Sequence, residues 1–240
     1  MKVALFVTCL VDAMRPEIAF SAIKLLEAAG CEVGVPETQT CCGQPAFNSG
    51  DTASARDLAV KTINELEQFE FVVVPSGSCA GQIKVHFHHL MQESTHWVTR
   101  AQQLASRTYE LTDFLANVAP RRTARSVSCG RITYHDSCSG LRELAVKAQP
   151  RALLAAAGVE LTEMKDCEQC CGFGGMFSIK FGDISGAIVD EKCRNIQAAG
   201  TDAVVLGDLG CMLNIEGRLQ RIGDEKTRVL HVAQVLAGDI

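Results

Sequence analysis

Cys41-Cys42-Gly43 and Cys170-Cys171-Gly172 are two copies of one short motif, and they lie 129 residues apart in a chain of 240 residues. Outward from this motif, two further pairs of cysteines keep nearly the same separation, 129 residues in the first pair and 132 in the second: Cys9 with Cys138, and Cys79 with Cys211. Matching residues at a fixed separation are the signature of an internal repeat. The sequence therefore predicts a duplicated structural unit.

The segments between these cysteines alternate between strand-like and helix-like patterns, in the same order in each half. In the first half we expect strands at residues 2–7, 31–35 and 71–74, and helices at 16–29 and 52–68. In the second half we expect strands at 131–135, 159–162 and 203–206, and helices through 151–157 and at 184–199. Such alternation predicts a parallel sheet with helices on both faces. The predicted fold is therefore α/β, with two tandem pseudo-symmetric Rossmann-like repeats, each a small parallel sheet flanked by helices.

The boundaries of the two repeats follow from the same comparison. Each half ends in a short amphipathic helical pattern, at residues 110–117 and 231–238. Between the halves lies a basic stretch that contains Pro120, at about residues 120–128, which we interpret as a solvated linker. We therefore expect the first repeat to span residues 1–119 and the second to span 129–240.

Composition excludes several classes of function. The net charge is −5, which gives no positive field for gathering phosphates, so we do not expect nucleic-acid binding. No apolar stretch approaches the roughly 20 residues that span a bilayer, and the N-terminus lacks a signal-peptide pattern, so we expect a cytoplasmic protein. In a reducing compartment, twelve cysteines indicate metal binding or redox chemistry rather than structural disulfides.

Four cysteines of each half follow predicted strands, at the edge of the sheet where open α/β folds bind ligands. Residues that are far apart in sequence are therefore expected to converge there. Four thiolates complete a tetrahedral zinc site or anchor a four-iron cluster. A glycine after each adjacent pair lets the backbone fold around a cofactor. We predict a metal or iron–sulfur site in each half, formed by Cys9, Cys41, Cys42, Cys79, Cys138, Cys170, Cys171 and Cys211.

Other residues near these motifs carry weaker signals. His135 lies at a predicted strand end, three residues before Cys138, and we expect it to support the ligands or to handle protons. Cys167 has CxxC spacing with Cys170, so we consider it as an extra ligand. The remaining cysteines are expected to fill the core, because cysteine is among the most buried residue types.

The cysteine pattern of both halves resembles the cysteine-rich CCG domain family, which includes the cysteine-rich subunit of heterodisulfide reductase and the iron–sulfur subunits of glycolate oxidase and anaerobic glycerol-3-phosphate dehydrogenase. The resemblance covers essentially the whole chain. Four stretches are most similar to the lactate-utilisation members of the family: Val7-Thr8-Cys9, Cys41-Cys42-Gly43-Gln44-Pro45, Cys170-Cys171-Gly172-Phe173-Gly174-Gly175 and Gly217-Arg218-Leu219-Gln220-Arg221.

This resemblance implies an iron–sulfur electron-transfer subunit of an L-lactate-oxidising system. Such a subunit passes electrons from the oxidation of lactate to pyruvate towards a quinone or a similar acceptor. The implied cofactor is a 4Fe-4S cluster, with zinc as the alternative in one or both repeats. The implied partners are a ferredoxin-like iron–sulfur protein and a third lactate-utilisation subunit. Nothing in the sequence resembles a site for the hydroxy acid itself.

The chain departs from the fullest family motif, which ends in CxxC and supplies five cysteines per repeat. Ser76 and Asp208 stand at the earlier of these two positions. Four thiolates per half therefore remain, which favours an ordinary four-iron cluster or zinc over a noncubane cluster. Asp208 can add an oxygen ligand, which zinc accepts. Two other functions stay open: a zinc-binding assembly subunit, and a thiol–disulfide oxidoreductase like the heterodisulfide reductase relatives.

Overall fold

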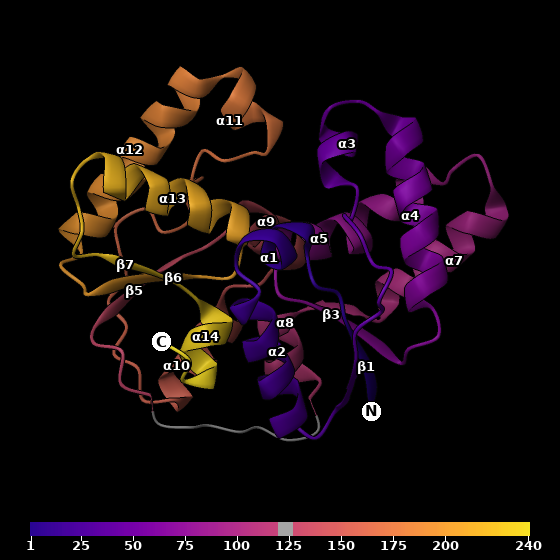
Figure 1. Ribbon diagram of the computed structural model, residues 1–240, viewed down its shortest axis with the longest axis horizontal. Helices are drawn as coiled ribbons and strands as arrows, with labels where there is room; N and C mark the ends of the chain where they lie inside the picture. The colour runs from indigo at the N-terminus through magenta and orange to yellow at the C-terminus, as the bar shows by residue number, and fades with distance from the viewer. Residues whose placement is uncertain (120–126) are drawn as a thin grey trace. The chain divides into compact units, whose positions relative to one another are not determined.

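The computed structural model of the protein describes residues 1–119 and 127–240. Contacts divide the chain into two compact units, Met1–Thr123 and Ala124–Ile240 (Figure 1). The predicted linker, at about residues 120–128, falls largely on residues 120–126, which lie outside the described part of the chain. Within the described residues, no helix is both long enough and apolar enough to cross a membrane.

The first unit contains a parallel sheet of four strands in the order β2-β1-β3-β4. Its strands are β1 (Lys2–Leu5), β2 (Glu32–Gly34), β3 (Phe71–Val74) and β4 (Thr108–Glu110). Its helices are α1 (Cys9–Met14), α2 (Glu17–Ala28), α3 (Gln44–Asn48), α4 (Thr52–Leu66), α5 (Gly77–Gly81), the π-helix η1 (Gln82–His86), α6 (Phe87–Leu90), α7 (Thr95–Ser106) and α8 (Leu111–Asn117).

Burial explains why the central strands form. Val3, Ala4 and Leu5 in β1, like the three valines at positions 72–74 in β3, are completely buried. Continuous apolar runs of this kind are typical of parallel strands that are covered on both faces. The chain passes from β1 to β2 on one side and then to β3 on the other side of β1. The carboxyl ends of β1 and β3 therefore flank the switch point, where open α/β sheets bind ligands.

The second unit repeats this plan with a parallel sheet of three strands in the order β5-β6-β7. Its strands are β5 (Ile132–His135), β6 (Ala203–Leu206) and β7 (Arg228–His231). Its helices are α9 (Cys138–Leu144), α10 (Ala148–Ala156), α11 (Met176–Lys180), α12 (Gly182–Ala198), α13 (Leu209–Arg221) and α14 (Val232–Ala237). Figure 1 shows α12 and α13 on one side of this sheet and α10 and α14 on the other.

The predicted fold class is confirmed, with two small parallel sheets flanked by helices. One predicted strand is wrong. Residues 159–162 make only a single parallel bridge, between Leu161 and Ile132. The reason lies at the end of α10, where Gly158 adopts a positive φ of 76° and Val159 donates its N–H back to the Leu154 carbonyl. The start of this segment therefore completes the helix end instead of extending the sheet.

Candidate metal centres

In the first unit, the predicted cysteines lie at the carboxyl edge of the sheet. Cys9 begins α1, directly after β1, and Cys79 lies in α5, directly after β3. Cys41 and Cys42 lie in the loop between β2 and α3. The Thr8 hydroxyl accepts a hydrogen bond from the Val11 N–H at 3.4 Å, so it caps α1 and fixes the backbone beside Cys9.

The four thiols of the first unit form a continuous series of contacts, which we call the first tetrad. Side-chain hydrogen bonds join Cys9 to Cys41, Cys41 to Cys42, and Cys42 to Cys79. Cys42 and Cys79 are buried, Cys41 is half-buried and Cys9 is exposed. The first tetrad therefore has a closed inner side and an open outer side.

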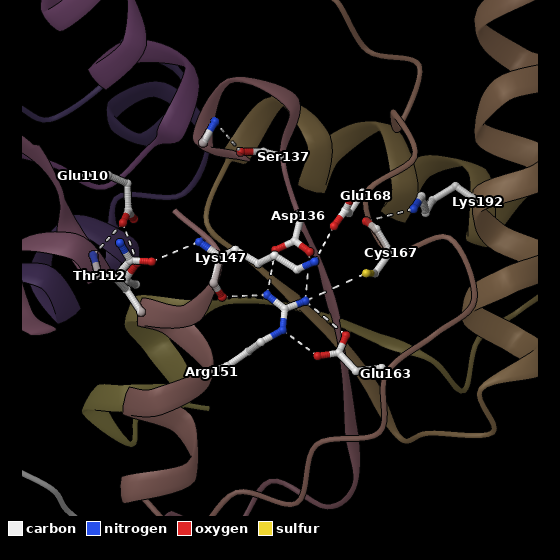
Figure 2. A network of polar contacts seen from close by, with 12 residues as sticks. Glu110, Thr112, Asp136, Ser137, Lys147, Arg151, Glu163, Cys167, Glu168 and Lys192 are labelled. Atoms are coloured by element: carbon white, nitrogen blue, oxygen red, sulfur yellow. Dashed lines mark hydrogen bonds and ion pairs between the residues drawn. The ribbon is translucent and has the colours of Figure 1, made fainter. Parts of the chain in front are cut away.

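The second unit places its cysteines in the same way. Cys138 begins α9 after β5, Cys211 lies in the first turn of α13 after β6, and the adjacent pair lies in the loop before α11. The second tetrad is joined by side-chain hydrogen bonds between the following pairs: Cys138 and Cys170, Cys170 and Cys171, and Cys171 and Cys211. The Ser137 hydroxyl caps α9 by accepting the Gly140 N–H at 3.3 Å (Figure 2).

The glycine after each cysteine pair has a structural reason. Gly43 and Gly172 have φ values of 84° and 86°, which other residues rarely adopt. In this conformation the Gly43 N–H donates to the Cys41 sulfur at 3.4 Å, and the Gly172 N–H donates to the Cys170 sulfur at 3.3 Å. Both loops therefore turn a backbone donor towards a sulfur that is expected to carry negative charge.

Neighbouring thiols also change the ionisation within each tetrad. Hydrogen bonds from Cys42 and then Cys9 lower the pKa of Cys41 well below the usual thiol range. Hydrogen bonds from Cys138 and then Cys171 lower the pKa of Cys170 in the same way. One thiol of each tetrad therefore ionises first, supported by two S–H donors and a backbone N–H. A thiolate is the form of cysteine that binds a metal.

The second unit contains a second kind of potential metal ligand, the imidazole of His135. One ring nitrogen of His135 and the sulfurs of Cys171 and Cys211 all lie within 4.8 Å of one another. Among the described residues this is the one group of three potential ligands at such short separations. Burial, followed by the charge of Lys192, lowers the pKa of His135 to about 3. The ring is therefore neutral at physiological pH and keeps a nitrogen lone pair.

Asp136, the residue after His135, belongs to a network of charged side chains (Figure 2). Asp136 is buried and accepts two hydrogen bonds of 2.8 Å from the Arg151 guanidinium. Arg151 also pairs with Glu163, and its Nη2 lies 4.0 Å from the Cys167 sulfur. These contacts tie the end of β5 to α10 and to the segment that leads into the Cys170–Cys171 loop.

Two residues that sequence reasoning missed take part in positioning the tetrads. Lys192 is fully buried, and its ammonium donates to the carbonyls of Asp166 and Cys167. The sequence pattern that could have revealed Lys192 is its place on the apolar face of α12, between Val189 and Ile196. In the first unit, the Gln39 side chain accepts the Val7 N–H at 2.9 Å. Nothing in the sequence distinguishes Gln39 from an ordinary polar loop residue.

The secondary ligand candidates have other partners. The Asp208 carboxylate accepts the Gly210 N–H at 3.1 Å and caps α13, and it does not belong to the group around His135. The Ser76 hydroxyl contacts the Ser78 hydroxyl at 3.2 Å. The Cys167 sulfur faces Arg151, while its carbonyl accepts from Asp136 and Lys192. Cys31, Cys129 and Cys193 are buried, in agreement with a core role.

A cavity of about 650 Å³ adjoins the open side of the first tetrad. Cys9 and Cys41 line it together with Asp12 and the apolar residues Phe20 and Ile23. All of its lining residues belong to the first unit. The cavity therefore gives a small molecule access to two of the four sulfurs.

The donor set of each unit fits a bound metal group. Soft thiolates are the ligands that zinc and iron–sulfur clusters prefer, and four of them meet at one sheet edge in each unit. In the second unit, the buried imidazole of His135 adds a donor whose ring nitrogens have no hydrogen-bond partner among the described residues. Both observations favour sites that bind a cofactor over cysteine and histidine side chains that only fill the core.

Comparison with known proteins gives consistent results. The sequence profile of the CCG cysteine-rich domain matches residues 3–84 and 132–216. Lactate utilization protein A from Geobacillus kaustophilus is 45% identical over 237 residues, which cover 98% of each chain. Lactate utilization protein A 2 from Bacillus cereus strain Q1 is 42% identical over 238 residues, which cover 99% of this chain and 98% of the relative.

A solved structure with little sequence similarity shares the fold. The crystal structure of a hypothetical protein from Helicobacter pylori matches with a TM-score of 0.68 at 10% identity. The match covers 98% of this chain and 48% of that protein, so the chain spans about half the length of that structure. At this level of identity the match supports the arrangement of strands and helices alone.

Proposed function

The chain belongs to the CCG cysteine-rich domain family, and from this membership we propose that it is the iron–sulfur electron-transfer subunit of an L-lactate-oxidising system. In this role it passes electrons from the oxidation of lactate to pyruvate towards a quinone or a similar acceptor. Two relatives that are 42% and 45% identical over nearly the full length carry the name lactate utilization protein A, which supports the choice of substrate.

The observation that carries the proposal is the convergence of four thiols in each unit. Each series of contacts joins one cysteine after the first strand, an adjacent pair in a loop and one cysteine after the next central strand. A protein that uses cysteine only to fill its core has no need for two such sets at matching sheet edges. The proposed ligands are therefore the eight cysteines of the first and second tetrads.

When bound, an iron–sulfur cluster supplies one-electron transfer over a wide range of potentials. The residues of the chain would hold and tune such a group. Cys42 and Cys171, which are buried, would hold such a group from the protein interior, and the N–H groups of Gly43 and Gly172 would offset the charge on the sulfurs of Cys41 and Cys170. Hydrogen bonds to ligand sulfurs raise the reduction potential of such a site, because they stabilise the added electron.

The first tetrad is the more accessible of the two on its outer side. Cys9 is exposed and lines the cavity beside the first tetrad, whereas Cys138 is half-buried. Electron transfer between proteins needs a short path from the cofactor to the surface. From the resemblance to the lactate-utilisation members of the family, we propose that the partners are a ferredoxin-like iron–sulfur protein and a third lactate-utilisation subunit, and that they meet this chain in the cytoplasm.

Purification of the full chain without oxygen tests the proposal. We expect a brown protein that contains iron and acid-labile sulfide, with a broad visible absorbance that decreases on reduction. In the presence of its two partners, lactate should cause the same decrease. A colourless anaerobic preparation that contains neither iron nor sulfide would contradict the proposal.

A zinc-binding role is the second candidate, and one observation favours it in the second unit. His135, Cys171 and Cys211 place three ligand atoms within 4.8 Å of one another, which suits a single small ion. Bonds of about 2.3 Å from zinc to sulfur separate tetrahedral ligands by about 4 Å. Zinc in the second unit and an iron–sulfur cluster in the first would together give one redox group per chain, a ratio that metal analysis measures directly.

A further inference from the structure

His135 differs from an ordinary core histidine. It ends β5, it is 0% exposed, and neither of its ring nitrogens has a hydrogen-bond partner among the described residues. The backbone of Cys167 lies close enough to affect the ring, but it does not complete a hydrogen bond of normal geometry. Buried polar atoms in native proteins almost always have partners, so this imidazole is open to a partner from outside the chain, such as a metal ion or a water molecule.

The sulfurs of Cys171 and Cys211 are close to this imidazole. Ligand atoms from His135 and these two cysteines all lie within 4.8 Å of one another, and all three residues are buried. Cys171 continues the series of thiol contacts to Cys170 and from there to Cys138. The imidazole therefore lies at the closed inner end of the second tetrad, beside its two buried cysteines.

The first unit provides a natural comparison. Phe6 lies 129 residues before His135, directly after β1, and it is also 0% exposed. The matching position of the repeat thus holds a buried phenyl ring in one unit and a buried imidazole in the other. A phenyl ring fills this place without any polar atom, so packing alone does not require histidine.

We propose that His135 is a nitrogen ligand of the metal group in the second unit, bound together with Cys171 and Cys211, while the first unit binds its group through thiolates alone. The inference rests on the proposed function only to the extent that the second tetrad holds a metal. It changes the role that the sequence suggested for His135, from a supporting residue to a ligand. Mixed thiolate and imidazole ligand sets are well suited to zinc, and histidine replaces cysteine on iron in some clusters.

Zinc is the probe for testing this assignment in the full chain. The protein is stripped of metal without oxygen and loaded with zinc ions, and X-ray absorption at the zinc edge then reports the ligand types. We expect two zinc ions per wild-type chain, and a spectrum with imidazole scattering from one ligand in addition to sulfur. A wild-type spectrum that shows sulfur ligands without imidazole overturns the proposal, and this measurement needs no variant.

His135→Phe gives the second unit the ring that the first unit already has. We expect this variant to lose the imidazole scattering and to bind one of its two zinc ions at least about 100-fold more weakly, since loss of an outer-shell partner alone costs about 10- to 100-fold in affinity. His89→Phe, at an exposed site, is the matched control and should leave both signals unchanged. Imidazole scattering that persists in His135→Phe overturns the assignment.

His135→Gln keeps a polar side chain and provides a second variant where His135→Phe does not fold. This variant should also lose the imidazole scattering, and a spectrum that retains the scattering would contradict the proposal. Failure of the proposed function appears in a different measurement. Absence of iron from the anaerobically purified chain would contradict electron transfer but leave the zinc spectrum unchanged, whereas a sulfur-only zinc spectrum would refute the ligand role of His135 whatever the iron content.

Discussion

The two units share one scaffold but surround their tetrads differently. In the first unit, Phe6 and Val7 follow β1, and the Gln39 side chain accepts the Val7 N–H. In the second unit, His135 and Asp136 occupy the matching places, and Asp136 is held by Arg151. The cysteines and the glycine turn are common to both units, so they define what any bound group requires. The surroundings differ, and we therefore expect the two centres to differ in ligands and in stability.

The cysteine pairs should be equally important in the two units. Their substitution has the largest expected effect, which is loss of a metal group. Cys42→Ser should remove the metal group of the first unit and Cys171→Ser that of the second, because a serine oxygen is a poor ligand for soft metals. Metal analysis of anaerobically purified protein should show loss of the group from one unit in each variant. Cys31→Ala, in the core outside both tetrads, should keep the full content. A serine variant that retains the full metal content would contradict the prediction that the two cysteine pairs are equivalent.

Because of the charged network of the second unit, substitution of Asp136 should cost more stability than substitution of Val7, its counterpart in the first unit. Asp136→Ala leaves Arg151 without its buried partner, and we expect it to lower the free energy of unfolding by about 3 kcal/mol. Val7→Ala, at the equivalent place in the first unit, loses only two methyl groups and should cost about 1 kcal/mol. Urea unfolding of the two variants measures the difference. Equal losses would mean that the network adds nothing to the stability of the second unit.

The helices that close the two units begin with different caps. In the first unit, buried Glu110 accepts the N–H groups of Thr112 and Asp113 (Figure 2), and His231 caps α14 in the second unit. Burial raises the pKa of Glu110 from 4.5 to about 7. The folded state therefore favours the protonated form, so this contribution to stability is complete below pH 4.5 and is lost as the pH rises to about 7.

Glu110→Gln should abolish this pH dependence. We expect the variant to gain up to about 3 kcal/mol over the wild type between pH 5 and pH 8, because its amide stays neutral while it can still accept hydrogen bonds. Thermal unfolding at a series of pH values measures the gain. Glu160→Gln, at an exposed position, should follow the wild type at every pH. A constant difference between Glu110→Gln and the wild type at all pH values would contradict the prediction.

The glycine turns provide the smallest difference between the units. Gly43→Ala and Gly172→Ala both place a side chain at positive φ, which costs about 1–2 kcal/mol. A Cβ atom at Gly172 would lie 2.7 Å from the Ser185 carbonyl oxygen, whereas at Gly43 the nearest atom is 3.3 Å away. We therefore expect Gly172→Ala to be less stable than Gly43→Ala by about 1 kcal/mol in thermal unfolding. The reverse order would show that the second loop can move.

Much of the fold was predictable from local pattern. The apolar runs at residues 71–74 and 203–206 form β3 and β6 with the expected bounds. Residues 159–162 also look like a strand, but the competition between pairing and completion of α10 depends on tertiary contacts that no local pattern records. The family resemblance is confirmed by the profile match and by the relatives.

The candidate site was only partly predictable. The spacing of the cysteines suggested two sets of thiols, and the structure places the members of each set in contact. The position of His135 at a strand end was visible in the sequence, but its burial and its distance from two sulfurs depend on packing. Gln39 and Arg151 act through long-range hydrogen bonds, which sequence spacing does not encode.

Anomalous X-ray diffraction from crystals of anaerobically purified protein is the most direct test of the central claim, that each tetrad holds a metal group. We predict a strong metal peak in each unit, within bonding distance of cysteine sulfurs of the first tetrad in one unit and of the second tetrad in the other. Tetrads without such a peak, with Cys41 and Cys42 or Cys170 and Cys171 present as free thiols or disulfides, would contradict the account.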